Sequence, residues 1–257
     1  MFKKNPEPTT LNNDTTTKRR LYLAMLCLFF LSAIVLQVVL FCAEPMLSRD
    51  GALYATLIQK HCDLGESFFY DDFNKPPLLL IIGSFIYRDF HCPAEIALLA
   101  VNILSSALLI FPIAYIGKLL FHSRRTALFC ALLIIGMPSL LSVSTGGTRE
   151  SLFFFFSACS LACALTFCTQ GSTFSLPISG CCVALAFLSR YEGVILIPII
   201  LTMLLVFCQP LTGWRKKISA CLLFFISIAA AMGICFLLSP IIRTFFHLFV
   251  AYIKKFL

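Results

Sequence analysis

Long apolar runs separated by short clusters of charge are the feature that most restricts the fold of this chain. The first run, from Leu21 to Cys42, would extend about 33 Å as an α-helix. The hydrocarbon core of a bilayer is about 30 Å thick, so a helix of this length crosses it. With 60% hydrophobic residues in 257, the chain is more apolar than a soluble domain can bury. The sequence therefore predicts an all-α, polytopic membrane protein.

Seven spans are predicted, with an eighth apolar segment that either spans or lies on the membrane surface. Residues 176–208 are too long for one upright helix and short for two complete spans. A hairpin with Arg190–Gly193 at its tip is favoured, because a single span would put the basic cluster Trp214–Lys217 outside, against the positive-inside rule. The predicted spans are residues 21–42, 94–117, 126–144, 151–168, the two arms of 176–208, and 218–238; the undecided segment is 241–252.

The polar residues 1–20 predict a disordered cytoplasmic tail, followed by one membrane domain over residues 21–257. A signal peptide is the rival interpretation of the first run, but its apolar core is typically only ~7 to 15 residues long. The basic cluster Lys18–Arg20 puts the tail in the cytoplasm and the polar loop 44–93 outside. Within that loop, Pro76–Tyr87 is too short to cross, which predicts a helix lying at, or dipping into, the outer surface.

Charge and cysteine content argue against two other classes of protein. The net charge is +8, but Lys and Arg fall between apolar runs as topology signals do, so nucleic-acid binding is not predicted. Most of the 13 cysteines lie inside apolar runs and are interpreted as small hydrophobic residues. For Cys62 and Cys92, both in the outer loop, a disulfide and two free thiols both stay open. His61 and His91, each followed by a cysteine, match no standard metal-ligand spacing.

Charged residues that adjoin apolar runs all come to the outer ends of helices in this topology. A charge at the bilayer centre costs about 2.5–3.5 kcal/mol on insertion scales, so such residues tend to face a partner or a wet cavity. The sequence therefore predicts a charged pocket at the outer membrane face, formed by Asp50, Arg149, Glu150, Arg190 and Glu192. Two structural alternatives stay open. Asp50 with Arg49 is also suited to capping a helix, and Arg149 with Glu150, or Arg190 with Glu192, to an ion pair that eases insertion.

Four sequence landmarks occur in an order that resembles a known family. After the first span come SRDGALYATL at residues 48–57 and KPPL at 75–78, which open and close the outer loop. GGTRESLFFFF follows at 146–156, and LSRYEGVILIPI at 188–199. Together they resemble the polyprenyl-phosphate-dependent C-type glycosyltransferases, and most closely the protein O-mannosyltransferase-like and lipid A aminoarabinose transferase-like branch. The resemblance covers roughly residues 20–210, and it rests on the ordered set rather than on any one motif.

The resemblance implies a mechanism and a role for each candidate residue. The acidic residue after the first span, here Asp50, would be the general base for the acceptor or a ligand of a divalent cation. The donor would be a sugar on a long isoprenoid phosphate, with Arg190 as the first candidate to bind the phosphate and Lys75 and Arg149 next. Glu150 and Glu192 would position the acceptor or the metal, and Arg49 and Tyr54 of the first landmark are further candidate substrate-binding residues.

The resemblance also implies an inverting sugar transfer to a lipid, glycan or protein acceptor, with a bacterial inner membrane as the location. Members of the family usually continue with several more spans and often a soluble outer domain. This chain is then a compact variant, one half of an enzyme with a second subunit, or a truncated product. Two other functions stay open: a transporter or flippase subunit, although the charges gather at one face without a detectable repeat, and a non-catalytic membrane scaffold.

Overall fold

The computed structural model describes residues 8–65, 76–208, 213–239, 241–245 and 247, and these residues form helices and connecting turns without a β-strand. The prediction of an all-α membrane protein is therefore confirmed. The helices are α1 (Pro8–Ala43), α2 (Arg49–Leu64), α3 (Leu78–Phe90), α4 (Ala94–Leu108), α5 (Ile110–Phe121), α6 (Arg124–Ile135), α7 (Pro138–Thr145), α8 (Glu150–Gln170), α9 (Ser175–Ser189), η1 (Tyr191–Ile195), α10 (Leu196–Thr202), η2 (Met203–Phe207) and α11 (Trp214–Leu238).

Four helical segments are long and apolar enough to cross a membrane: Thr16–Ala43 of α1, α4 with α5 (Ala94–Phe121), α8 and α11. The pair α6 and α7, bent by 53°, would make a fifth. The seven or eight predicted spans are more than the structure shows. The difference lies mainly at residues 176–208, because the charged turn at Arg190 divides this run into α9 and a second short helical stretch, Tyr191–Phe207. Each is below the ~20 apolar residues that a span requires.

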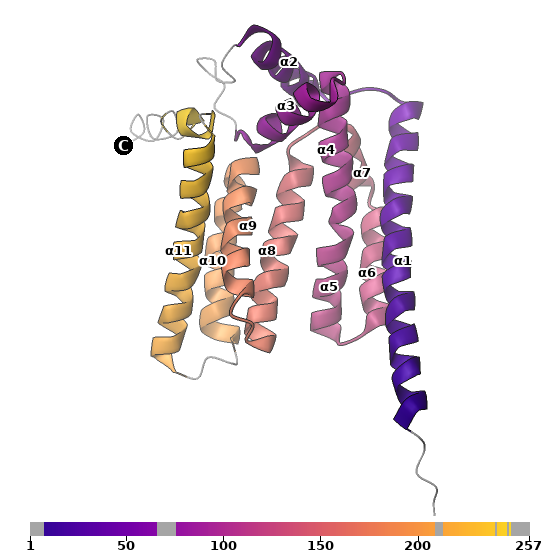
Figure 1. Cartoon of the computed structure of the whole chain (residues 1–257), viewed down its shortest axis with the longest axis vertical. Helices are drawn as coiled ribbons and strands as arrows, with labels where there is room; N and C mark the ends of the chain where they lie inside the picture. Colours follow the sequence, from indigo (N-terminus) through magenta and orange to yellow (C-terminus); the bar gives the residue numbers. More distant parts are fainter. Residues whose placement is uncertain (1–7, 66–75, 209–212, 240, 246, 248–257) are drawn as a thin grey trace, which may run out of the picture.

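The bundle helices run side by side, and α2 and α3 cover one end of them, at the top of Figure 1. Small residues allow close packing in the bundle, as is common between membrane helices. Ser160 of α8 and Ser179 of α9 each donate a hydrogen bond to the other's backbone carbonyl, at 3.1 and 2.9 Å. At Gly180, an added Cβ would lie 2.2 Å from the Ser227 hydroxyl of α11. The glycine therefore lets α9 and α11 approach each other.

The end cap is built from α2, α3 and the start of α4. Tyr54 and Ile58 of α2 are buried against Leu79 of α3 and Leu98 of α4. The helix α3 corresponds to the short helix predicted at residues 76–87, and it lies across the end of the bundle (Figure 1). This packing fixes α2, which carries Asp50, over the ends of the bundle helices.

Three further predictions, two for the ends of the chain and one for the outer loop, can be compared with the structure. Residues 8–20, predicted as a disordered tail, are helical and continue into α1, because a helix that is already nucleated propagates easily into the residues beside it. Cys62 and Cys92 are both free thiols. Of the undecided segment 241–252, residues 241–245 are helical, with Ile242 and Phe245 buried against Leu78 and Leu188; residues 248–252 lie outside the described residues.

Candidate active site

The N-terminus of α2 is docked onto the turn that precedes α8. Ser48 is the N-cap of α2, and its hydroxyl accepts a hydrogen bond from the Gly51 amide at 3.0 Å. The same residue donates twice to the Gly146 carbonyl, from its amide at 3.0 Å and from its hydroxyl at 2.8 Å. This contact brings the landmark at residues 48–57 against the landmark at residues 146–156, which lies about a hundred residues away in sequence.

Gly51 makes this docking possible. A Cβ at this position would lie 2.2 Å from the Gly146 carbonyl oxygen, and that oxygen belongs to backbone that cannot move aside as a flexible side chain would. Gly147, the next residue of the turn, has a φ of +71°, which favours glycine. Two glycines in succession therefore form the surface on which α2 begins.

Replacing Gly51 with Ala is expected to move the start of α2 away from the turn and lower the activity by at least about tenfold, since a ~1 Å displacement near reacting groups can cost ~10²-fold. The measurement is sugar transfer by purified full-length chain, compared with the control Ala52→Ser on the exposed face of the same helical turn. Equal activities for Gly51→Ala and the control would show that the docking has no functional role.

Tyr54 lies at the centre of the charged residues. Its side chain is 1% exposed, and the Arg149 guanidinium lies 5.7 Å from the centre of its ring, a distance typical of a cation–π contact. Burial raises the pKa of the Tyr54 hydroxyl well above its usual range, and Asp50 and Glu150 raise it further, whereas Arg149 and Arg190 lower it. These four charged groups are therefore near enough to act on one buried phenol, and Tyr54 stays protonated at neutral pH.

Arg190 joins two carboxylates that come from different elements. Its Nη1 pairs with Glu150 Oε1 at the start of α8, while its Nη2 and Nε bind the two oxygens of Glu192 at 2.7 and 3.1 Å. The hydrogen bonds from Arg190 lower the pKa of the Glu192 carboxyl to about 2. Glu192 is thus ionised at all but strongly acidic pH, and its pairing with Arg190 is lost only as the pH falls toward that value.

The turn that carries Arg190 is itself held closely against α9 and the C-terminal segment. A Cβ at Gly193 would lie 2.5 Å from the Phe187 amide nitrogen, so only glycine fits beside the end of α9. The Tyr191 ring stacks on Phe245 with the ring centres 6.1 Å apart. These contacts restrict the position of Arg190 and favour the ion pair between its guanidinium and Glu150.

The structure brings together six of the eight residues named from the sequence: Asp50, Tyr54, Arg149, Glu150, Arg190 and Glu192. Arg49 is exposed beside them, and within the described part of the chain it makes no hydrogen bond or ion pair with the others. Lys75 lies outside the described residues. Asp50 is exposed, so its carboxylate is accessible to a substrate. The roles assigned to these residues stay predictions.

Of the two ion pairs expected between sequence neighbours, Arg190 with Glu192 is present and Arg149 with Glu150 is not. Arg149 does not pair with Glu150 but lies over Tyr54, and Glu150 pairs with Arg190 instead. No carboxylate of the described residues lies within ion-pairing distance of Arg149. Its guanidinium is therefore the cation of the group that is available to an anionic ligand, whereas that of Arg190 is already bound by two carboxylates.

The predicted metal site gains no ligand set from the described residues. No group of three or more His, Cys, Asp and Glu side chains among them is arranged to hold a metal ion. Ca²⁺ and Mg²⁺ need about six oxygen ligands, and here Arg190 already binds three carboxylate oxygens of Glu150 and Glu192. The divalent cation stays a prediction, and no step proposed below depends on one.

An apolar groove of about 340 Å³ lies in the bundle beside this group. It is lined by Leu109 and residues of α5, by Met137 and residues of α6 and α7, and by Phe154, Ala158 and Leu161 of α8. Glu150 is four residues before Phe154, so the carboxylate and the groove residues follow one face of α8. Leu161 is about 16 Å further along the helix than Glu150 at 1.5 Å per residue. The groove therefore extends from near the charged end into the apolar part of the bundle.

A second cavity, of about 560 Å³, adjoins the docking contact on the side of α1 and α7. It is lined by apolar residues together with Glu44, Ser48, Ser142 and Thr145. This cavity was not predicted from the sequence, because its walls are distant in sequence and only Ser48 and Gly146 of its lining belong to the landmarks. The Gly146–Gly147 pair is the one local signal of the close approach that borders it.

Residues 74–238 match the family described as dolichyl-phosphate-mannose-protein mannosyltransferases. Because the match covers more than half of the chain, the protein belongs to this family, and it is a membrane glycosyltransferase of the C type. The matched region contains Arg149, Glu150, Arg190 and Glu192, whereas Asp50 and Tyr54 precede it. No curated protein matches the chain significantly.

Proposed function

We propose that this protein transfers a sugar from a polyprenyl-phosphate carrier to a hydroxyl group of a lipid, glycan or protein acceptor. The observation that supports this most directly is the meeting of Asp50, Arg149, Glu150, Arg190 and Glu192 around Tyr54, at the end of the bundle capped by α2 and α3. An exposed carboxylate, a cation without a carboxylate partner among the described residues and an apolar groove are the three parts that such a reaction needs.

The proposed chemical step is a single displacement at the anomeric carbon. Asp50 takes the proton of the acceptor hydroxyl as its oxygen forms a bond to that carbon. The bond from the carbon to the phosphate oxygen breaks, and polyprenyl phosphate leaves with the electron pair. Attack from the side opposite the phosphate inverts the configuration. No enzyme nucleophile is required, and the proton ends on Asp50 before release to solvent.

Arg149 is the proposed phosphate-binding residue, in preference to Arg190. A guanidinium can donate two parallel hydrogen bonds to a phosphate, and that of Arg149 has no carboxylate competitor within the described residues. Glu150 contributes differently. Its Oε2 is buried and has no hydrogen-bond partner among the described residues, and a buried acceptor of this kind gains from a donor. A sugar hydroxyl of the donor would supply one.

The apolar groove along α8 is the proposed path of the isoprenoid chain. Phe154, which lines the groove, is five residues beyond Arg149 and thus about 7–8 Å further along the helix axis. A phosphate held by Arg149 would have its first isoprene units at the mouth of the groove. The remaining units would extend through the groove into lipid.

The membrane orientation is part of the proposal. The link between α5 and α6 and the start of α11, where the basic clusters lie, are at the opposite end of the bundle from α2 and α3 (Figure 1). The positive-inside rule favours a cytoplasmic location for these clusters. The charged group would then face outward, and we propose the bacterial inner membrane as its location. Tagging both ends and labelling engineered cysteines from either side would test this.

The decisive test is the reaction of the full chain alone in lipid nanodiscs. Polyprenyl-phosphate-mannose is the first donor to supply, followed by other polyprenyl-phosphate sugars, with release of polyprenyl phosphate as the measurement. Release with inversion at the anomeric carbon supports the proposal. Absence of release with the whole panel, both alone and after addition of membrane extract that could supply a second subunit, would contradict it.

Replacing Arg149 with Gln is expected to raise the KM for the donor by about tenfold or more, because a charge-assisted hydrogen bond contributes ~1.5–3 kcal/mol. Arg149→Lys should recover part of the loss, since it keeps the charge but not the paired donors. The control is Arg88→Gln, an exposed arginine of α3 outside the charged group. A donor KM that Arg149→Gln leaves unchanged would remove Arg149 from phosphate binding.

A further inference from the structure

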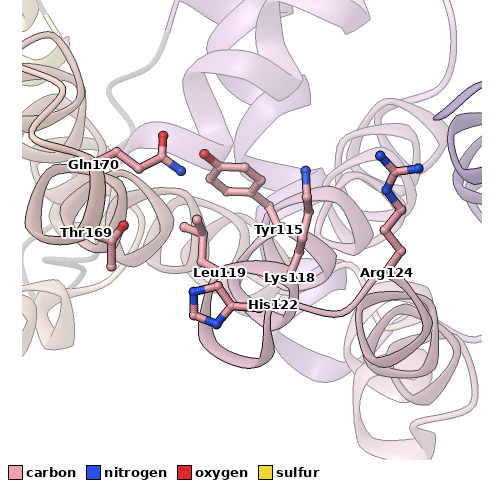
Figure 2. A pocket seen from close by; sticks show the side chains of 7 residues that line it. All are labelled: Tyr115, Lys118, Leu119, His122, Arg124, Thr169 and Gln170. Atoms are coloured by element: carbon pink, nitrogen blue, oxygen red, sulfur yellow. The ribbon is translucent and has the colours of Figure 1, made fainter. Parts of the chain in front are cut away.

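A different cavity, lined by polar and basic residues, lies at the opposite end of the bundle from the candidate active site. Its volume is about 560 Å³, and it is formed by the end of α5, the α5–α6 corner and the end of α8. Lys118, His122 and Arg124 line one side, and Thr169 and Gln170 line the other. Figure 2 shows Gln170 extending toward the Tyr115 ring, with Lys118 and Arg124 extending toward the same side of the view.

The local backbone positions these side chains. His122 ends α5 in the left-handed conformation, with a φ of +52°, which is unusual for a residue other than glycine. The chain then turns sharply at Ser123, whose hydroxyl accepts from the Thr126 amide and caps α6 at 3.3 Å. The sharp corner brings Arg124, the first residue of α6, to the same cavity as Lys118, which lies one turn before the end of α5.

The charge in this cavity is of one sign. Its lining contains no carboxylate, and the chain has no Asp or Glu between Glu95 and Glu150. Among the described residues, none of Lys118, His122 and Arg124 lies in an ion pair. Two permanent cations that share a cavity repel each other, and a bound anion would remove that repulsion.

Neutral hydrogen-bonding groups face the same space. The Tyr115 hydroxyl lies 3.3 Å from the Thr166 hydroxyl of α8, which holds the ring at the boundary between the two helices. The Thr169 hydroxyl donates to the Leu165 carbonyl at 2.8 Å. The Tyr115 hydroxyl and the Gln170 amide therefore remain as donors beside the two cations, and together these groups match the several oxygens of a phosphate.

We propose that this cavity binds the phosphate group of an anionic phospholipid in the leaflet at this end of the protein. A basic pocket between membrane helices at headgroup depth suits such a group. If these basic residues served only as signals for membrane topology, positive charge at this end would be enough, and neither a cavity nor neutral hydrogen-bond donors would be needed. Arg125 provides the comparison within the chain, because it is an exposed neighbour of Arg124 that does not line the cavity.

The test is lipid binding by the purified full chain. It is measured by native mass spectrometry with phosphatidylglycerol and phosphatidylcholine as probes. The wild-type chain should retain phosphatidylglycerol preferentially. Lys118→Gln with Arg124→Gln should weaken this binding by roughly fivefold for each charge removed. The matched double variant Arg125→Gln with Arg215→Gln removes the same charge from exposed positions outside the cavity and should change the binding by less than about twofold.

A competition experiment distinguishes a lipid headgroup from free phosphate, and a further variant tests the proposal even if the double variant does not fold. Inorganic phosphate that competes with the lipid at millimolar concentration would assign the cavity to a free phosphate rather than a headgroup. Tyr115→Phe removes one hydroxyl without a change of charge or size, and it should weaken retention even if the double variant is unstable. Equal losses in the two double variants, or no preference for either phosphate probe, would overturn the proposal. The readout is binding, so it is independent of the proposed sugar transfer.

Discussion

Replacing Asp50 with Asn is expected to lower the rate of sugar transfer by about 10²–10⁴-fold while the donor KM changes little, since a positioned general base typically contributes that much. Asn keeps nearly the size of Asp and its ability to accept a hydrogen bond, but it cannot take the acceptor proton. The expected loss is therefore in kcat. Transfer is measured as the initial rate of polyprenyl phosphate release by the full chain in nanodiscs.

The matched control for this variant is Asp63→Asn on the same helix. Asp63 is exposed, and its carboxylate accepts a hydrogen bond from the Tyr87 hydroxyl at 3.0 Å, an interaction that an Asn oxygen preserves. Asp63→Asn should retain nearly full activity. If Asp50→Asn also retained most of its kcat, another group would be the base, and Asp50 would be left with its place in the first turn of α2, where an acidic side chain is favourable.

Hydropathy predicted the parts of the fold in which length alone decides the outcome. The apolar runs that became α1, α4 with α5, α8 and α11 are long enough to cross on their own. In residues 176–208 the predicted break at Arg190–Gly193 is present, but the two arms, α9 and Tyr191–Phe207, are shorter than a membrane span requires. Arg190 adopts an extended conformation, with φ −151° and ψ 142°, so α9 ends there.

The charged group could be predicted as a set but not as a network. The positive-inside rule predicted that Asp50, Glu150 and Arg190 would share one end of the bundle. It carries no information on pairing. Adjacent residues in a helix point about 100° apart, so Arg149 and Glu150 do not face each other. The partner of Glu150 comes from forty residues further on, and only the packing of α8 against α9 determines that.

The same packing explains why the preferred phosphate ligand changes from Arg190 to Arg149. From sequence, Arg190 had one carboxylate nearby, Glu192. In the structure it has two, and a third negative group, a phosphate, would have to displace one of them. Arg149 has an aromatic face instead, and an arginine that rests on an aromatic ring keeps its N–H donors free for a ligand.

Removing Arg190 is expected to affect both stability and activity, and a double variant separates the two effects. Arg190→Gln leaves the Glu150 carboxylate, whose side chain is 25% exposed, without its cation. Loss of one partner of a fully buried pair costs ~3–5 kcal/mol. Because this pair is partly exposed, about 1–3 kcal/mol of unfolding free energy is a better expectation. It is measured as a fall in Tm in detergent.

Adding Glu150→Gln to Arg190→Gln removes the carboxylate that was left without a cation, so the double variant should regain much of the lost stability. The interaction between the two changes is then opposite in sign to their separate effects. Activity should not return, because neither the Arg190 guanidinium nor the Glu150 carboxylate remains in the site. The exposed pair Arg88–Asp89 gives the baseline, and Arg88→Gln should change stability by less than about 0.5 kcal/mol. Recovery of both stability and transfer in the double variant would mean that Arg190 and Glu150 serve only to hold α8 and η1 together, and that the chemistry rests on Asp50 and Arg149 alone.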